Sequence, residues 1–190
     1  VRDPELVIDF YNERRKQLLD VEPNAGHTGL AELEKDFNVT VVTQNVDNLH
    51  ERAGSTHVIH LHGELTKVCS SRDPYNPRYV RELKPEEYEV KMGDKAGDGS
   101  QLRPFIVWFG EAVPEIETAI GYVEKADIFV IIGTSMNVYP AAGLLNYVPR
   151  TAEVYLIDPK PVDTHSMRQI HVIQKGASEG VKELKTEILH

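Results

Sequence analysis

Three short segments of the chain combine residue types that can do chemistry with small neighbours that let a ligand approach. The first is TQNVDNLH at 43–50, where Gln44, Asn45 and Asp47 directly follow the apolar, β-branched run 39–42. Amides and carboxylates can bind a carboxamide or a ribose through hydrogen bonds. The same residue types also favour helix N-termini, so spacing alone favours a simple cap for Asn45 or Asp47.

The second segment is HLHGEL at 60–65. Alternation along a strand predicts that His60 and His62 share one face, with His62 at the strand end before a glycine that admits a ligand. A neutral histidine in that position can act as a general base near neutral pH. A metal-binding pair and a hydrogen-bonded core histidine are equally compatible with these two residues, so their spacing leaves the role open.

The third segment begins with Gly133, Thr134 and Ser135, which follow the apolar run 128–132 and precede an expected helix. A glycine after a buried strand, two hydroxyl groups and a helix N-terminus suit a phosphate or a ribose. An ordinary strand–turn–helix connection with a serine cap explains the same residues equally well.

Apolar runs alternating with helical patterns must position these segments. The expected strands are 39–42, 58–61, 104–108, 128–132, 154–157 and 171–173. Helices are expected over about 4–19, around 30–37, and over about 47–53, 115–125, 140–145 and 178–189. Short apolar strands alternating with helices predict an α/β fold, a Rossmann-like parallel sheet with helices on both faces. Ligands of such sheets bind beyond the carboxyl ends of the strands.

Residues 66–101 interrupt this pattern, because they are rich in proline, glycine and charge and poor in apolar residues. We therefore expect a Rossmann-like domain built from 1–65 and 102–190, with 66–101 as a small irregular insert. The insert is expected to pack through its larger side chains, namely Tyr75, Tyr79, Leu83 and Tyr88.

Composition excludes several classes of protein. The net charge of −9 argues against a nucleic-acid partner, because phosphate binding requires a basic surface. There is one cysteine, so no intramolecular disulfide can form, which suits the cytoplasm. No apolar run is long enough to predict a membrane span. The first residues do not form a signal peptide, and the chain opens on a helix start without Met, which predicts a fragment or a trimmed chain.

Taken together, the runs TQNVDNLHERAG, HLHGEL, VWFGE and GTSMNVYPAAG resemble the sirtuin family, in its order and approximate spacing. The resemblance covers nearly the whole chain outside the insert. It implies an NAD-dependent protein-lysine deacylase that acts on acylated lysine side chains and releases nicotinamide and O-acyl-ADP-ribose. It also implies a monomer or a weak dimer. The alternative is a non-catalytic module that binds ADP-ribose or an acyl-lysine peptide.

The resemblance assigns roles to individual residues. His62 is implied as the general base that activates a ribose hydroxyl, Asn45 and Asp47 as nicotinamide-binding residues, and Gln44 as a ribose-binding residue. The residues implied on the adenosine side are Gly133, Thr134, Ser135 and Ala177, with Asp158 where the family often has an asparagine. Those implied to pair with the substrate backbone are Val107, Phe109, Gly110, Glu111 and, on the other side, Val138.

Tyr11 and Arg14 narrow the expected substrate. They lie three positions apart in a predicted helix and so share a face. A guanidinium beside a phenol can bind a carboxylate through charge-assisted hydrogen bonds. The pair resembles the Tyr-x-x-Arg motif of the sirtuins that remove succinyl and malonyl groups, which implies desuccinylase and demalonylase activity besides deacetylase activity. A surface arginine in a charge-rich helix is the alternative.

Two departures from the family pattern stand out. Most sirtuins carry four cysteines that bind a structural zinc, whereas Cys69 stands alone here, so we expect no zinc. The family's first strand and its glycine-rich GAGxS loop, which cradles the diphosphate of NAD, are absent from this sequence. We therefore expect this stretch by itself to bind NAD poorly.

Overall fold

The computed structural model describes residues 3–133, 141–162 and 168–190. The chain divides into two compact units, and each draws on separate stretches of sequence. The first unit comprises 1–22, 45–48 and 60–113, and the second comprises 23–44, 49–59 and 114–190. Within the described residues, no helix has the length and apolar character needed to cross a bilayer.

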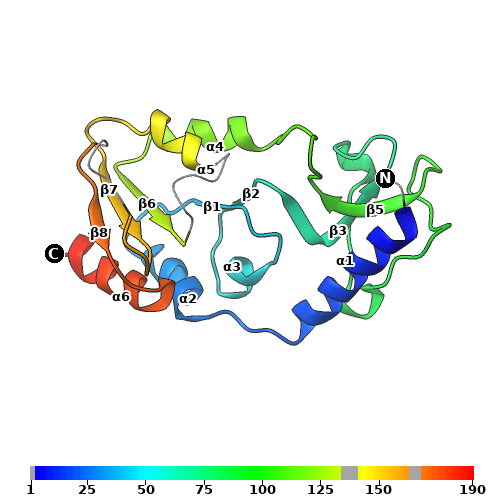
Figure 1. Ribbon diagram of the computed structural model, residues 1–190, viewed down its shortest axis with the longest axis horizontal. Coiled ribbons are helices and arrows are strands. Elements are labelled where there is room, and N and C mark those ends of the chain that lie inside the picture. The colour runs from blue at the N-terminus through cyan, green and yellow to red at the C-terminus, as the bar shows by residue number, and fades with distance from the viewer. Residues whose placement is uncertain (1–2, 134–140, 163–167) are drawn as a thin grey trace. The chain divides into compact units, whose positions relative to one another are not determined.

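The first unit contains one long helix and an antiparallel sheet (Figure 1). Its elements are α1 (Pro4–Leu19), β3 (Gly63–Ser70), β4 (Arg81–Glu82), β5 (Leu102–Ile106) and the 3-10 turns Pro77–Tyr79 and Pro85–Glu87. The sheet order is β4-β3-β5. As predicted, α1 begins after Asp3, whose carboxylate accepts a hydrogen bond from the Leu6 amide at 3.0 Å.

The strand expected at 104–108 exists as β5, but its partner differs from the expectation. β5 pairs antiparallel with β3, with Cys69 opposite Arg103 and Ser70 opposite Leu102. It therefore does not belong to the parallel sheet. A short apolar run carries no information about its pairing partner, which explains why the sequence could not place it.

The stretch 66–101 is less irregular than its composition suggested, because it contributes to an apolar core that it shares with α1 and β5. Val68 and Cys69 are fully buried in it. The buried cluster consists of Ile8, Val68, Leu83, Val90, Ala96 and Leu102. Of the side chains expected to hold the insert, Leu83 is in this cluster, whereas Tyr75 is exposed and Tyr79 and Tyr88 are half-buried.

The second unit contains the predicted parallel sheet. Strands β6 (Ile128–Ile132), β7 (Glu153–Ile157) and β8 (His171–Ile173) pair in parallel in the order β6-β7-β8. The remaining elements are β1 (Val41–Thr43), β2 (Val58–His60), α2 (Ala25–Leu33), α3 (Leu49–Arg52), α4 (Ile116–Val123), α5 (Ala141–Leu144), α6 (Ala177–Ile188) and the 3-10 turn Leu145–Tyr147. Strands β1 and β2 form a separate two-stranded sheet. The parallel sheet and its helices confirm the α/β class.

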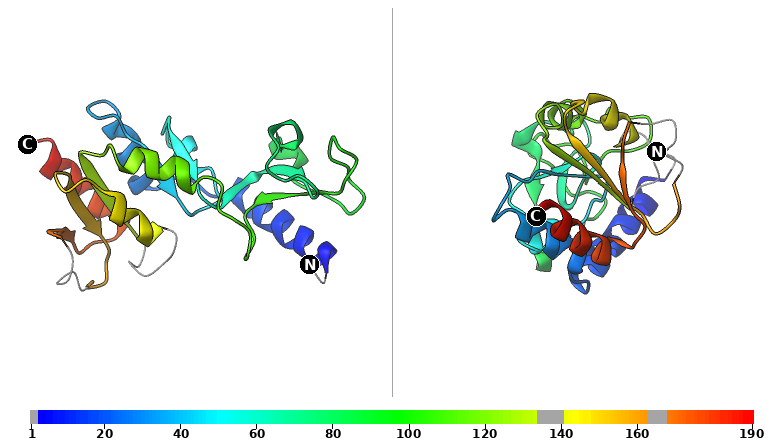
Figure 2. Two further views of the ribbon diagram at one scale, coloured as in Figure 1. Left: turned by 90° about the horizontal axis from the view of Figure 1, so that it is seen from above. Right: turned by 90° about the vertical axis from the view of Figure 1, so that its left-hand side faces the viewer.

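Two glycines allow α6 to lie against its neighbours in the second unit (Figures 1 and 2). A Cβ atom at Gly180 would lie 2.2 Å from Cγ2 of Ile157 on β7, and one at Gly29 would lie 2.7 Å from Cγ1 of Val181 on α6. Both distances are far inside van der Waals contact, so only glycine fits the observed spacing. The core beneath α6 includes Ile157, Val181 and Leu184, all almost completely buried.

Candidate active site

The polar segment after β1 and the histidine segment after β2 are joined by hydrogen bonds within the first unit. Nδ1 of His60 donates to the carbonyl oxygen of Asn45 at 3.1 Å. The Leu65 amide donates to the carbonyl oxygen of Val46 at 2.7 Å. Two segments about fifteen positions apart in the sequence, 45–48 and 60–65, therefore lie side by side, as the strand-end argument requires.

The two histidines of this site have different surroundings. His60 is 8% exposed and, through its bond to Asn45, is the hydrogen-bonded core histidine among the alternatives left open by the sequence. His62 is half-buried and follows the end of β2, so strand alternation does not govern the direction of its side chain. Its carbonyl oxygen accepts from the Val107 amide at 2.9 Å, which attaches this turn to the end of β5.

Gly63 is required for packing between β3 and β5. Its φ is +84°, in the left-handed region that favours glycine. A Cβ atom there would lie 2.1 Å from the carbonyl oxygen of Phe105. This contact between the start of β3 and β5 is a reason for a glycine at position 63 that the sequence did not reveal, and the expected ligand access stays a prediction.

Residues 107–111, four of which are predicted to bind substrate, form a tight turn. The Glu111 amide donates to the carbonyl oxygen of Trp108 at 3.0 Å, and Gly110 has φ +87°. Phe109, at the tip, is completely exposed. The main chain of this turn carries the residues predicted to pair with a substrate backbone, and that role stays a prediction.

Sequence reasoning missed Arg103, which holds this turn. Arg103 is 7% exposed, and its guanidinium donates to both carboxylate oxygens of Glu111 at 2.8 and 3.0 Å. This pairing is the main reason that the pKa of Glu111 lies below its usual value. A charged residue within a strand that is otherwise apolar, LRPFI, was the available signal.

Tyr11 and Arg14 lie on α1, where the neighbouring Arg15 makes the buried contacts. Arg15 donates to the carbonyl oxygen of Leu65 and to Oδ1 of Asn12, both at 2.7 Å, and burial lowers its pKa to about 10. Arg14 is exposed and Tyr11 is half-buried, with a phenol pKa raised by that burial. The arginine of the Tyr-x-x-Arg pair therefore remains accessible to a ligand.

Three predicted cofactor residues follow the carboxyl ends of adjacent parallel strands in the second unit. Gly133 follows β6, Asp158 follows β7, and Ala177 opens α6 after β8. The register aligns these ends, because Ile132 pairs with Ile157. Such an edge is where parallel sheets bind ligands. Thr134, Ser135 and Val138 lie outside the described residues.

The local geometry of this edge fits a nucleotide. Gly133 has φ +60°, in the left-handed region that favours glycine, and among the described residues no atom lies within 4 Å of the position of an added Cβ. Oδ1 of Asp158 accepts from the Lys160 amide at 2.8 Å, which fixes the carboxylate at the strand end. A fixed carboxylate can accept hydrogen bonds from ribose hydroxyls.

The residues around Cys69 do not fit a structural zinc. The thiol is fully buried, donates to the carbonyl oxygen of Pro104 at 3.7 Å, and has its pKa raised to about 11 by burial. Ser70 and Ser100 instead share Asp98, with Ser70 Oγ donating to Oδ2 at 2.6 Å and Ser100 Oγ to Oδ1 at 2.7 Å. Oxygen atoms and one protonated thiol do not make a tetrahedral zinc site.

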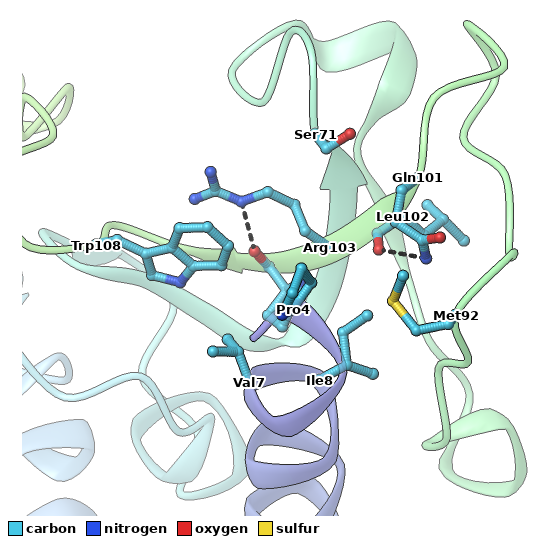
Figure 3. A pocket seen from close by; sticks show the side chains of 10 residues that line it. Pro4, Val7, Ile8, Ser71, Met92, Gln101, Leu102, Arg103 and Trp108 are labelled. Carbon is cyan, nitrogen blue, oxygen red and sulfur yellow. Dashed lines mark hydrogen bonds between the residues drawn. The ribbon is translucent and has the colours of Figure 1, made fainter. Parts of the chain in front are cut away.

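A cavity of about 300 Å³ lies between the start of α1 and β5 in the first unit (Figure 3). Its lining is mostly apolar, and none of the predicted site residues contributes to it. The apolar lining residues are Pro4, Val7, Ile8, Met92, Leu102, Pro104 and Trp108. Volume alone therefore does not locate the candidate site.

Known proteins are similar to this chain in both sequence and fold. The profile of the Sir2 family matches residues 1–140. The chain belongs to the Sir2 family. An NAD-dependent protein deacylase of Bacteroides thetaiotaomicron is 85% identical over 184 residues, covering 97% of this chain and 79% of the relative. A Helicobacter pylori protein of the same name is 47% identical over 188 residues, covering 99% of this chain and 80% of its own length.

Solved Sir2 structures give the same result. A Sir2 homologue in complex with NAD superimposes with a TM-score of 0.84 at 35% identity, covering 99% of this chain and 73% of its own. A Sir2 complex with a p53 peptide and NAD⁺ gives a TM-score of 0.71 at 30% identity, covering 90% and 72%. Both likenesses are above 25% identity and cover at least 90% of this chain, in agreement with its membership of the Sir2 family.

Proposed function

We propose that this Sir2-family protein is an NAD-dependent protein-lysine deacylase. The observation that carries the proposal is the hydrogen-bonded pairing of the Asn45–Asp47 segment with the turn that bears His62. The same turn is attached to Val107, at the start of the predicted substrate-binding turn. The residues proposed as the base, as the nicotinamide-binding groups and as the peptide-binding turn all belong to the same compact unit, which supports the proposal.

NAD supplies the chemistry when it is bound, since its ribose accepts the acyl group while nicotinamide leaves. In this proposal Asn45 and Asp47 bind the nicotinamide end, and Gln44 binds the adjoining ribose. His62 removes a proton from a ribose hydroxyl and so acts as the general base. On the adenosine side the proposed residues are Gly133, Thr134, Ser135, Asp158 and Ala177.

The substrate side of the proposal is an acylated lysine of a protein. The main chain of residues 107–111, with Val138 opposite, pairs with the substrate backbone by strand addition, which demands little of the substrate's sequence. Tyr11 and Arg14 bind the distal carboxylate of succinyl-lysine or malonyl-lysine. The exposure of Arg14 beside the half-buried phenol of Tyr11 supports this acyl preference.

The test is turnover of acetyl-lysine and succinyl-lysine peptides with NAD by the full-length protein, followed by mass spectrometry of the products. Nicotinamide and O-acyl-ADP-ribose are expected in equal amounts. The His62→Asn variant should lose at least about a hundredfold in kcat, the usual contribution of a general base. His171→Asn, on exposed β8, is the matched control and should retain activity.

Two outcomes would contradict the proposal. If the full-length protein binds ADP-ribose but releases no nicotinamide from NAD, it is a non-catalytic binding module. If His62→Asn retains full turnover with an unchanged melting temperature, the general base lies elsewhere.

A further inference from the structure

The carboxylate of Glu111 sits at the centre of a set of hydrogen bonds that we call the carboxylate clamp, made of Tyr75, Arg103, Trp108 and Glu111. The Trp108 amide donates to Oε2 of Glu111 at 2.9 Å, while the Glu111 amide donates to the Trp108 carbonyl at 3.0 Å. Two hydrogen bonds between Trp108 and Glu111, with each residue donating once, therefore close the turn. Its tip, Phe109 and Gly110, lies between them.

Arg103 anchors the clamp in the protein interior. Besides the two bonds to Glu111, its Nη2 donates to the carbonyl oxygen of Ile106 at 2.7 Å. Its guanidinium also lies 3.7 Å from the centre of the Trp108 ring, in the geometry of a cation–π contact (Figure 3). A planar fork can hold a carboxylate, a carbonyl and an indole in fixed relation, which an ammonium group cannot do.

Tyr75 extends the clamp into the stretch 66–101. Its hydroxyl donates to Oε2 of Glu111 at 3.2 Å, and its ring meets Phe105 edge-on with centroids 6.4 Å apart. The insert without zinc ligands thus contacts the turn directly. Hydrogen bonds to a charged acceptor are stronger than neutral ones, so each donor contributes to the order of the turn.

Resting on the proposed deacylase function, we propose that Arg103 and Tyr75 are positioning residues that act through Glu111 to preform the 108–111 turn for the substrate main chain. Neither residue touches the reacting atoms. Because the turn is already ordered, substrate binding does not incur the entropic cost of ordering that backbone. Loss of the clamp therefore weakens peptide binding rather than the chemical step. Glu111 thus serves through its side chain as well as its main chain.

The first arm of the test is amide hydrogen exchange in residues 107–111 of the full-length protein, which does not depend on activity. Tyr75→Phe removes one donor and should raise exchange of this segment about threefold to tenfold. Arg103→Lys retains the charge but loses the fork, and should raise exchange further. Tyr79→Phe and Arg81→Lys, in the same unit, are the matched controls and should change nothing.

The second arm compares steady-state constants for an acyl-lysine peptide and for NAD. Tyr75→Phe should raise the KM for peptide about threefold to tenfold, and Arg103→Lys more, with kcat and the KM for NAD within about twofold of the parent. A purely structural role would instead move both KM values and kcat together. That result, or unchanged exchange in 107–111, overturns the inference.

The two proposals fail in different ways. If the parent protein turns over no acyl-peptide, the deacylase function fails, whereas the exchange arm still reports on the clamp. If exchange rises but the KM for peptide stays constant, the clamp orders the turn without positioning substrate, and the inference is wrong.

Discussion

His60 and His62 are two positions apart and chemically identical, yet the protein uses them differently. His60 is buried and donates to a backbone carbonyl, so its cost of desolvation is offset by a hydrogen bond. His62 is half-buried in a turn whose main chain is fixed by the Val107 amide. An accessible side chain on a fixed backbone is compatible with the general-base role proposed for His62.

A prediction at the residue scale concerns acyl selectivity. Arg14→Leu should lower kcat/KM for a succinyl-lysine peptide about tenfold to a hundredfold, because a charge-assisted bond to the distal carboxylate is lost. Activity on an acetyl-lysine peptide, which has no such carboxylate, should stay within about threefold of the parent. The measurement is kcat/KM for both peptides, with Lys16→Leu, at an exposed position on the same helix, as the control. Equal loss of both activities would contradict a role in carboxylate recognition.

The close approach of a helix to a neighbouring strand in this protein depends on individual glycines. Gly180 brings α6 onto Ile157 of β7, and Gly121 occupies a helix position with no neighbour within 4 Å of an added Cβ. The same substitution at these two glycines therefore has opposite physical consequences. One introduces an overlap, and the other only removes backbone freedom from the unfolded chain.

Gly180→Ala should accordingly lower the free energy of unfolding by about 1–3 kcal/mol, the usual cost of overpacking. Gly121→Ala, within α4, should raise it by up to about 1 kcal/mol, because alanine is the better helix former. Urea unfolding followed by circular dichroism measures both. Equal effects at the two positions would show that α6 does not rely on its close approach to β7.

The hydroxyl–carboxylate cluster of the insert gives a prediction about pH. Hydrogen bonds from Ser70 first, and then from Ser100, lower the pKa of Asp98 from 3.8 to about 2. A carboxyl group with a depressed pKa stabilises the fold fully above its unfolded value and loses that contribution as the pH falls toward its folded value. Between about pH 4 and pH 2 the Asp98 contribution should therefore disappear.

Asp98→Asn should abolish part of this acid sensitivity. Amide exchange in β3 and in residues 98–102 at pH 7 should rise in the variant, whereas the difference from the parent should shrink on acidification. Asp36→Asn, at an exposed position distant in sequence from Asp98, is the control. A difference between variant and parent that is constant with pH would exclude the titration of Asp98 as its cause.

At the scale of elements, sequence patterns predicted which helices and strands form better than they predicted which strands pair. The parallel strands β6, β7 and β8 and the helices α1, α4 and α6 were predicted close to their observed bounds, because their apolar periodicity and caps are local features. The antiparallel pairing of β5 with β3 was not predicted, since register depends on residues about forty positions away. The insert core was missed for the same reason, because it takes Ile8 from α1.

The candidate site shows the same division. Gln44, Asn45, Asp47 and His62 were predicted from residue types and family motifs, as were most of the other proposed contacts, and their roles stay predictions. Arg103 was not found, because its role depends on a bidentate bond to Glu111 that only the folded turn creates. The packing role of Gly63 was not predicted, since its close approach to Phe105 belongs to the tertiary structure.

On the scale of the whole molecule, the chain builds its first unit from three separate stretches, 1–22, 45–48 and 60–113. α1 is the part that closes the core of the insert, through Ile8, and Asn12 adds a two-way bond with the backbone of Val90 at 2.7 and 2.9 Å. The insert core is therefore incomplete without the helix that carries Tyr11 and Arg14. Stability of the first unit and the proposed acyl recognition therefore depend on one element.

Ile8→Ala should destabilise the first unit by about 2–5 kcal/mol, the usual cost of deleting a large buried side chain. Hydrogen exchange should rise in β3, β4 and β5 and remain unchanged in β6, β7 and β8, because the second unit has its own core. Leu6→Ala, 66% exposed on the same helix, is the matched control and should be near neutral. A uniform rise across both units would mean that they unfold as one.

The cluster of Ser70, Asp98 and Ser100 bears on how the protein withstands its chemical surroundings. Nothing in that cluster can be extracted by a chelator or oxidised by peroxide. The single thiol of the sequence is buried and remains protonated at neutral pH, so it is a poor target for oxidants. Zinc depletion and oxidative stress disrupt modules that are held together by metal–thiolate bonds. The hydrogen bonds among Ser70, Asp98 and Ser100 are not sensitive to either condition in this way.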